Sequence, residues 1–232
     1  METLLPRWPA VALMLVLPAT GCGTRAPAGG GPDPAPGSAA AASAELEALY
    51  WARVDSARAR YTEADVRFMT DMIAHHAQAI VMSRLAPERS ASGSIRTLAA
   101  RIINAQQDEI AIMQQWLRDR GEAVPEVHIT GSTLTVHGAG DHAMHMPGMI
   151  TDVELRALAS AEASGFDRLF LTYMIRHHRG AITMVRDLFA ADGAGQDPAV
   201  FKFASDVHVD QATEVARMEL MLAALPPAAG GP

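Results

Sequence analysis

Cysteine is nearly absent from this chain, since Cys22 is the only one in 232 residues. The residues after Cys22 therefore offer no disulfide and no thiolate, which excludes a cysteine-ligated zinc or iron–sulfur site. Aromatic residues are also rare, at 5%, and the apolar residues are mainly Ala, Leu, Ile, Val and Met. This composition favours packed helices over sheets, in which β-branched and aromatic residues are preferred.

Basic residues are scarce as well, because 19 Lys and Arg stand against 26 Asp and Glu, for a net charge of -7. Binding to a nucleic-acid backbone needs clustered cations, so we expect no nucleic-acid partner. The sequence also has no Gly-rich phosphate loop, no HExxH zinc motif and no Ser/His/Asp catalytic pattern. We therefore expect that the protein is not an enzyme.

Residues 1–21 resemble a bacterial signal peptide of the lipoprotein type. Arg7 provides a positive start, and the apolar stretch Val11–Leu17 is too short to span a membrane as a stable anchor. Small residues precede Cys22, as in a lipobox whose cysteine is lipidated, although Ala19 stands where Leu is usual. Ordinary signal-peptide cleavage is the alternative. Both readings predict export across the cytoplasmic membrane, and the first adds a lipid anchor in the cell envelope.

Composition and periodicity divide the rest of the chain into three parts. Residues 22–44 are rich in Gly, Pro, Ala and Ser and predict a disordered tether. Residues 45–61 predict a lead-in helix, and residues 62–226 predict a helical domain. Within that domain, helical patterns and capping signals cover residues 62–85, 94–120, a short segment from 151, 166–190 and 198–225. The intervening pieces 127–129 and 134–136 predict a small hairpin.

An internal repeat organises the helical domain into halves of about 62–121 and 151–226. Residues Phe68 to His76 match Phe170 to His178 at an offset of 102, and the offset holds onward to the Met82 and Met184 pair. The second helices match more loosely, at an offset of 105. Each half predicts a helical hairpin with one apolar face, so two halves predict an all-α four-helix bundle with approximate two-fold symmetry.

Methionine and histidine recur on one helix face in both halves. Thioether sulfur and imidazole nitrogen together favour Cu(I), with Cu(II) as the alternative where nitrogen and oxygen dominate. Methionine at helical spacing is also a common core residue, and the His pairs could instead hydrogen-bond to Gln106 and Glu109 or to Gln211 and Glu214. Such partners would also orient metal-bound imidazoles. The candidate ligands on the helices are Met72, His75, His76, Met82, Met174, His177, His178 and Met184.

A second group of the same residue types lies in the segment between the halves. Methionine and histidine alternate there without a helical period, and exposed thioethers have no packing purpose, so this pattern indicates copper more strongly than the helix faces do. The alternative is that Met146 and Met149 fold back onto the bundle, and we expect His128 and His208 to be structural. The candidate ligands of the linker are His137, His142, Met144, His145, Met146 and Met149.

These motifs resemble the domain-of-unknown-function family 305 (DUF305) over about residues 62–225. The resemblance is carried by the two His-His motifs, the Met-Pro-Gly-Met sequence at 146–149 and the Phe-Asp-Arg-Leu-Phe sequence at 166–170. It implies a ferritin-like bundle and a relationship to CopM-type envelope proteins that bind copper and support copper tolerance. Two departures stand in the second half: Leu171 replaces the methionine found at Met69, and Arg179 places a cation where an acidic residue is common.

The sequence therefore predicts Cu(I) sequestration or delivery in the cell envelope, with the linker and the first half as the preferred ligands. A metal-free interaction lipoprotein is the first alternative. A ferritin-like di-iron or di-manganese oxidase is the second, but such sites need two Glu-x-x-His motifs and this sequence has none.

Overall fold

The structure of the protein is a computed structural model that describes residues 36–58, 60–138 and 145–226. The predicted signal peptide and the predicted lipidation site Cys22 lie outside the described residues, as do the candidate ligands His142 and Met144. These features therefore stay predictions.

Helix α1 (Pro36–Arg58) is the first described element. It begins at Pro36, whereas the sequence predicted a disordered tether up to residue 44 and a helix only from residue 45. The physical reason is the composition of this segment, because alanine has the highest helix propensity and proline suits the first helical turn. Its large apolar side chains are exposed to solvent, namely those of Leu46, Leu49, Tyr50 and Trp51.

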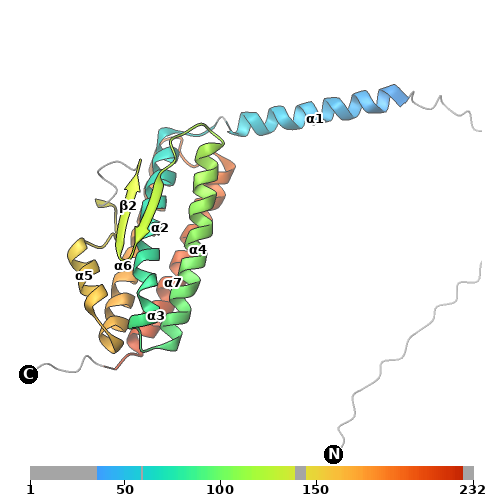
Figure 1. Ribbon diagram of the computed structural model, residues 1–232. Coiled ribbons are helices and arrows are strands. Elements are labelled where there is room, and N and C mark those ends of the chain that lie inside the picture. The colour runs from blue at the N-terminus through green and yellow to red at the C-terminus, as the bar shows by residue number, and fades with distance from the viewer. Residues whose placement is uncertain (1–35, 59, 139–144, 227–232) are drawn as a thin grey trace, which may run out of the picture. The chain divides into compact units, whose positions relative to one another are not determined.

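Four long helices form a bundle of two hairpins (Figure 1). Helix α2 packs against α4, α6 packs against α7, and α2 and α6 contact each other between the two hairpins. The mostly helical structure confirms the all-α prediction and its two repeated hairpins, whereas the ferritin-like relationship stays a prediction. The bounds of these helices are α2 Glu63–Arg84, α4 Gly93–Arg118, α6 Ala163–Ala190 and α7 Pro198–Ala223.

Shorter elements join and cover the bundle. A two-stranded antiparallel hairpin packs on α2, with Val127 opposite Val136 and both side chains against the core, which confirms the predicted hairpin. Two short helices pack against α6, and one of them also contacts α2 and α4. The bounds of these elements are α3 Ala86–Arg89, β1 Glu126–Thr130, β2 Thr133–His137 and α5 Asp152–Ser160.

Local capping explains where the helices begin. Thr62 and Thr151 each form a capping box with the acidic residue three positions later, as predicted for α2 and α5. The start of α4 differs from the prediction at Ser94, because Ser92 is the residue whose side chain accepts the Ile95 amide. Helix α6 starts at Ala163, three residues before the predicted position.

Two buried carboxylates lock the halves of the bundle together. Asp65 on α2 accepts the amide of Gly195, which lies in the loop between α6 and α7, at 2.7 Å. Asp167 holds the equivalent position on α6 and accepts the Ser90 hydroxyl from the loop between α3 and α4. Each half therefore anchors the loop of the other half, and the repeat is reciprocal in its contacts as well as in its sequence.

A third buried carboxylate, Asp197, connects α4 to α7. It caps α7 by accepting the amides of Ala199 and Val200 at 2.9 and 3.1 Å, and it also accepts the indole N–H of Trp116. The Arg120 guanidinium forms an ion pair with Asp197 and stacks on the Trp116 ring. Both ionic side chains are more than 90% buried, so neither can exchange its partner for water.

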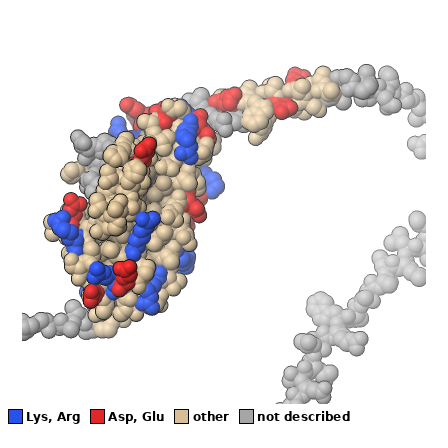
Figure 2. All heavy atoms as spheres, viewed as in Figure 1, with Lys and Arg blue, Asp and Glu red and all other residues tan. Residues whose placement is uncertain are grey.

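The surface of the bundle is charged in a mixed way. Figure 2 shows basic and acidic side chains interspersed over the visible face of the bundle, as expected for solvated helix faces. No helix among the described residues is long and apolar enough to cross a membrane.

We expect the Asp197→Ala substitution to lower the free energy of unfolding by about 3–5 kcal/mol, because the Arg120 guanidinium would remain buried without its carboxylate. Urea denaturation followed by circular dichroism measures the loss. Asp206→Ala on the same helix is the matched control, since its ion pair with Lys202 is exposed and should contribute less than about 1 kcal/mol. Equal losses in the two variants would contradict a special role for Asp197.

Candidate metal centre

The paired histidines form a polar layer in the middle of the bundle. The side chains of His75, His76, His177 and His178 are fully buried. Two hydrophobic clusters flank this layer, one containing Met72 and Met184 and the other containing Met82 and Met174. The eight candidate ligands of the helices are thus brought together. However, no methionine among them shares a cluster with its equivalent in the other repeat, which would pair Met72 with Met174 and Met82 with Met184.

This pairing follows from the antiparallel packing of α2 against α6. Around one pocket, Phe68 and Asp71 of α2 face Leu188 and Met184 of α6, so the two helices run in opposite directions. The rings of His75 and His177 meet near the midpoint, with their centroids 3.8 Å apart.

Three of the four imidazoles have an oxygen partner at Nε2. His75 Nε2 lies 3.0 Å from the carbonyl oxygen of Pro147. His76 Nε2 lies 2.7 Å from Glu109 Oε2, and His178 Nε2 lies 2.7 Å from Glu214 Oε2. From the sequence, contacts of the His pairs with Glu109 and Glu214 were the alternative to metal binding, and the structure contains both contacts.

The partner of His75 fixes the position of its proton. A carbonyl oxygen only accepts hydrogen bonds, so Nε2 of His75 donates and Nδ1 keeps its lone pair. Burial, helped by repulsion from His76, lowers the pKa of His75 to about 3. Burial, helped by repulsion from His75 and His178, lowers the pKa of His177 well below its ordinary value. Both imidazoles are therefore neutral near pH 7, which is the form that ligates metal ions.

Unpaired nitrogen atoms remain in this layer. Nδ1 of each of the four imidazoles is buried without a hydrogen-bond partner, as is Nε2 of His177. Nε2 of His76 lies 2.7 Å from Glu109 Oε2 but also lacks hydrogen-bond geometry. Leaving such an atom unsatisfied costs about 1–3 kcal/mol, and a bound metal ion is one of the ways to satisfy a lone pair. In the described part of the chain, however, His, Asp and Glu form no group of three or more that could hold a metal ion. A metal held here would need methionine sulfur as well.

The linker segment 145–150 passes directly over the imidazole layer. The side-chain amide of Gln78 on α2 holds the linker through two hydrogen bonds. Its nitrogen donates to the Ile150 carbonyl at 2.9 Å, and its oxygen accepts from the Ile150 backbone N–H at 2.8 Å. On the other side, Gly148 adopts φ +79° and lies so close to α6 that a Cβ on Gly180 would sit 2.0 Å from the Pro147 oxygen. Glycine is therefore required at both contact points.

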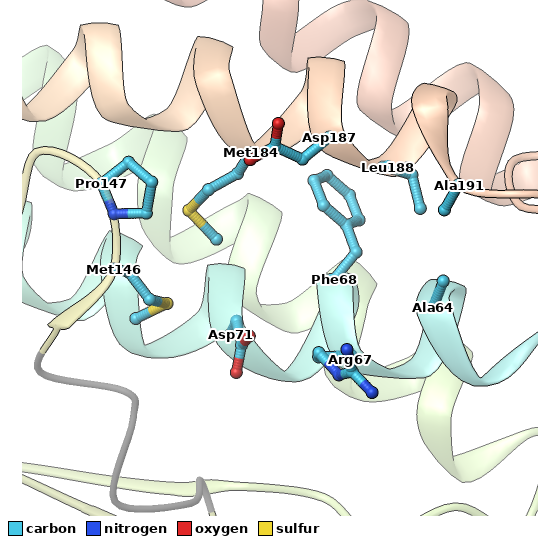
Figure 3. Close-up of a pocket in the computed structure, with 10 residues that line it drawn as sticks. All are labelled: Ala64, Arg67, Phe68, Asp71, Met146, Pro147, Met184, Asp187, Leu188 and Ala191. Atoms are coloured by element: carbon cyan, nitrogen blue, oxygen red, sulfur yellow. The ribbon is translucent and has the colours of Figure 1, made fainter.

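The seated linker places Met146 in a surface pocket of about 250 Å³ between α2 and α6. Figure 3 shows the thioethers of Met146 and Met184 facing the same space, one from the linker and one from α6. Phe68 and Leu188 form apolar walls, and three charged side chains also line the pocket. They are Arg67, Asp71 and Asp187.

The other predicted ligands among the described residues of the linker do not converge on this pocket. Met149 is partly buried against the core, and Met146 is 92% buried, so the alternative in which both methionines fold back onto the bundle describes their packing. His137 and His145 are exposed. The assignment of all these residues as metal ligands stays a prediction.

Sequence reasoning missed the residues that seat the linker. Gln78 and Gly180 occupy equivalent positions in the two repeats, at the offset of 102, yet they are chemically different. That difference next to the matching His-His motifs was the available signal. Gln78 and Gly180 differ because each contacts a different part of the single linker.

In the metal-free protein, stability should fall as the pH drops below about 6.5. The unfolded chain binds a proton at His75 near that pH, whereas the folded chain resists protonation until about pH 3. The contribution of neutral His75 is therefore complete above pH 6.5 and is lost progressively toward pH 3. Between pH 7 and pH 5 it should amount to on the order of 2 kcal/mol, measured by urea denaturation at both pH values.

The His75→Gln variant is the matched control for this pH dependence. Its amide nitrogen can still donate to the Pro147 carbonyl, but it does not titrate. The variant should lose less stability than the parent chain between pH 7 and pH 5. An unchanged loss would show that the dependence arises elsewhere.

Replacement of Gly180 should displace the linker. A Cβ at this position meets backbone atoms of Pro147 and Gly148, so Gly180→Ala should lower the free energy of unfolding by about 1–3 kcal/mol. Gly165→Ala on the same helix is the control, because a Cβ there meets no atom within 4 Å. Thermal denaturation compares the two variants, and a Gly180→Ala protein as stable as the control would contradict the seat described here.

Comparison with known proteins identifies a matching family model and similar solved structures. The family model described as Domain of unknown function (DUF305) matches residues 65–222. A candidate secreted DUF305 protein from Streptomyces coelicolor is 26% identical, with a TM-score of 0.58, and the match covers 73% of this chain and 96% of that one. For a DUF305 fragment from Deinococcus radiodurans the identity is 29% and the TM-score 0.58, with coverage of 70% and 97%.

A third similar structure is that of CopM in its Cu(I)-bound form. It is 26% identical, with a TM-score of 0.51, and the match covers 68% of this chain and 95% of CopM. CopM has also been solved in Cu(II)-bound, Ag-bound and apo forms. No curated protein sequence matches the chain. The family model spans most of the helical domain, including both His-His motifs, and the chain therefore belongs to the DUF305 family.

Proposed function

We propose that the protein binds Cu(I) in the cell envelope and either sequesters it or hands it on to a partner. The observation that carries this proposal is the pocket in which Met146 and Met184 present two thioethers. Thioether sulfur is a soft ligand that selects Cu(I) over harder cations, and the neutral imidazoles beneath the linker suit copper in both of its oxidation states.

Similarity to CopM supports copper as the cargo. CopM is known in Cu(I)-bound, Cu(II)-bound and Ag-bound forms, and silver(I) shares the preference of Cu(I) for soft ligands. The identity of 26–27% supports a shared kind of binding, while the ligands in this chain are proposed from its own residues.

An extracytoplasmic location supports the same role. Residues 1–21 and Cys22 form a lipoprotein-type leader in the sequence, and a similar DUF305 protein from Streptomyces coelicolor is described as a candidate for secretion. Methionine sulfur remains a copper ligand in compartments where exposed cysteine would oxidise. The proposed role is binding rather than catalysis.

One observation favours a metal-free structural module as the second candidate. His76 and His178 already hold glutamate partners at 2.7 Å, so these residues have a structural use without copper. In that case copper would change neither the thermal stability of the protein nor the NMR signals of its histidines.

An anaerobic competition titration of the mature protein against a Cu(I) chelator separates these candidates. We expect at least one chelator-resistant equivalent of Cu(I), and X-ray absorption at the copper edge should report sulfur among the ligands. The variant lacking all four paired histidines and the His/Met residues of the linker should lose this binding. Binding that survives in that variant, or a spectrum with only nitrogen and oxygen ligands, would refute the proposed site.

A further inference from the structure

We infer that the duplicated Met/His motif forms one copper pocket rather than two. This pocket lies on the side of the bundle where the N-terminal part of α2 meets the C-terminal part of α6. The inference rests on the proposed function and specifies which half of the repeated motif performs it. In sequence the two sides of the bundle are equivalent, since Met184 corresponds to Met82 and Met72 to Met174. In the structure their surroundings differ.

The two sides of the bundle differ in the charge of equivalent residues. Arg67, Asp71 and Asp187 lie around the pocket that holds Met146 and Met184. At the offset of 102, their counterparts are apolar or aromatic and pack against the second hydrophobic cluster. These counterparts are Leu169, Tyr173 and Leu85.

Burial of the pocket walls follows the same division. Phe68, Met184 and Leu188 retain 5%, 8% and 4% of their solvent exposure. Their counterparts in the other half are Phe170, Met82 and Ala86, each with 0% exposure. The thioether of Met82 is therefore sealed, whereas that of Met184 borders the pocket.

Helix α5 closes the second side. Its residues Leu155 and Leu158, together with Ile150, belong to the cluster that contains Met82 and Met174. The helix is held in place by Glu154, whose two carboxylate oxygens each lie 2.7 Å from the Arg176 guanidinium on α6. This guanidinium holds the pKa of Glu154 down at about 2, so the ion pair persists across the neutral range.

Among the described residues, the linker supplies methionine only to the first side. It lies between Gln78 and Gly180, which are equivalent positions, and it then continues into α5 on the second side. One connection cannot occupy both symmetric positions at once. Met146 is thus supplied to one pocket, and the segment that follows it fills the other.

This asymmetry determines where a copper ion can enter. Two carboxylates and one guanidinium line the pocket, and this net negative charge favours the approach of a cation, whose water ligands the two thioethers can replace as it enters. On the second side an ion would have to pass apolar side chains without replacement ligands, which is strongly unfavourable. Met82 and Met174 are therefore core residues despite their position in the repeated motif.

Four single Met-to-Leu variants test the inference, because leucine preserves volume and removes only the sulfur. The full mature chain is titrated anaerobically with Cu(I) against a chelator, and thermal denaturation confirms that each variant is folded. Met146→Leu and Met184→Leu should each weaken one equivalent of Cu(I) at least tenfold, so that the chelator removes it. Met82→Leu and Met174→Leu should retain the full amount with less than a twofold change.

The outcomes separate the inference from the function on which it rests. If all four variants weaken copper binding equally, both sides of the bundle bind and the single pocket is wrong, although the proposed function stands. If only Met82→Leu and Met174→Leu weaken binding, the pocket has been assigned to the wrong side. If the parent chain retains no Cu(I) against the chelator, the proposed function fails and the inference fails with it.

Discussion

The antiparallel packing of α2 against α6 is the constraint on which the rest of the structure depends. It brings His75 and His177 into contact at the centre and places a methionine of each repeat on both sides of them. With α4 and α7 on the outside, the two inner helices bury polar groups that no single hairpin could satisfy. The linker crosses this seam, where its Pro147 carbonyl accepts a hydrogen bond from His75 Nε2.

A buried layer of imidazoles is an unfavourable feature for a protein core, and the structure compensates it only in part. The Pro147 carbonyl and Glu214 satisfy the Nε2 atoms of His75 and His178, while every Nδ1 is left unpaired. Apolar residues of similar size would avoid this penalty. The neutral imidazoles of His75 and His177 support the proposed binding role, because a lowered pKa keeps their lone pairs available to a soft cation.

Local signals in the sequence were sufficient for the hairpins, the capping boxes at Thr62 and Thr151 and the small β-hairpin, because each depends on residues close together in the chain. The grouping of ligands was not predictable in the same way. A repeat identifies equivalent residues, such as Met72 and Met174, but not neighbours, and antiparallel packing joins Met72 with Met184 instead. The positions of α5 and the linker were hidden because they depend on long-range contacts.

Duplication creates two equivalent surfaces, and a single linker between the halves must break that equivalence. The two repeats therefore differ at equivalent positions. Gln78 corresponds to Gly180, where the linker is seated, and Asp71 corresponds to Tyr173, where one side has a charged residue and the other an aromatic one. Such pairs distinguish residues kept for packing from those available to a ligand. A repeated motif is thus weak evidence for a repeated site, since the helices need the whole motif to pack whereas the proposed copper site needs only the side that stays open.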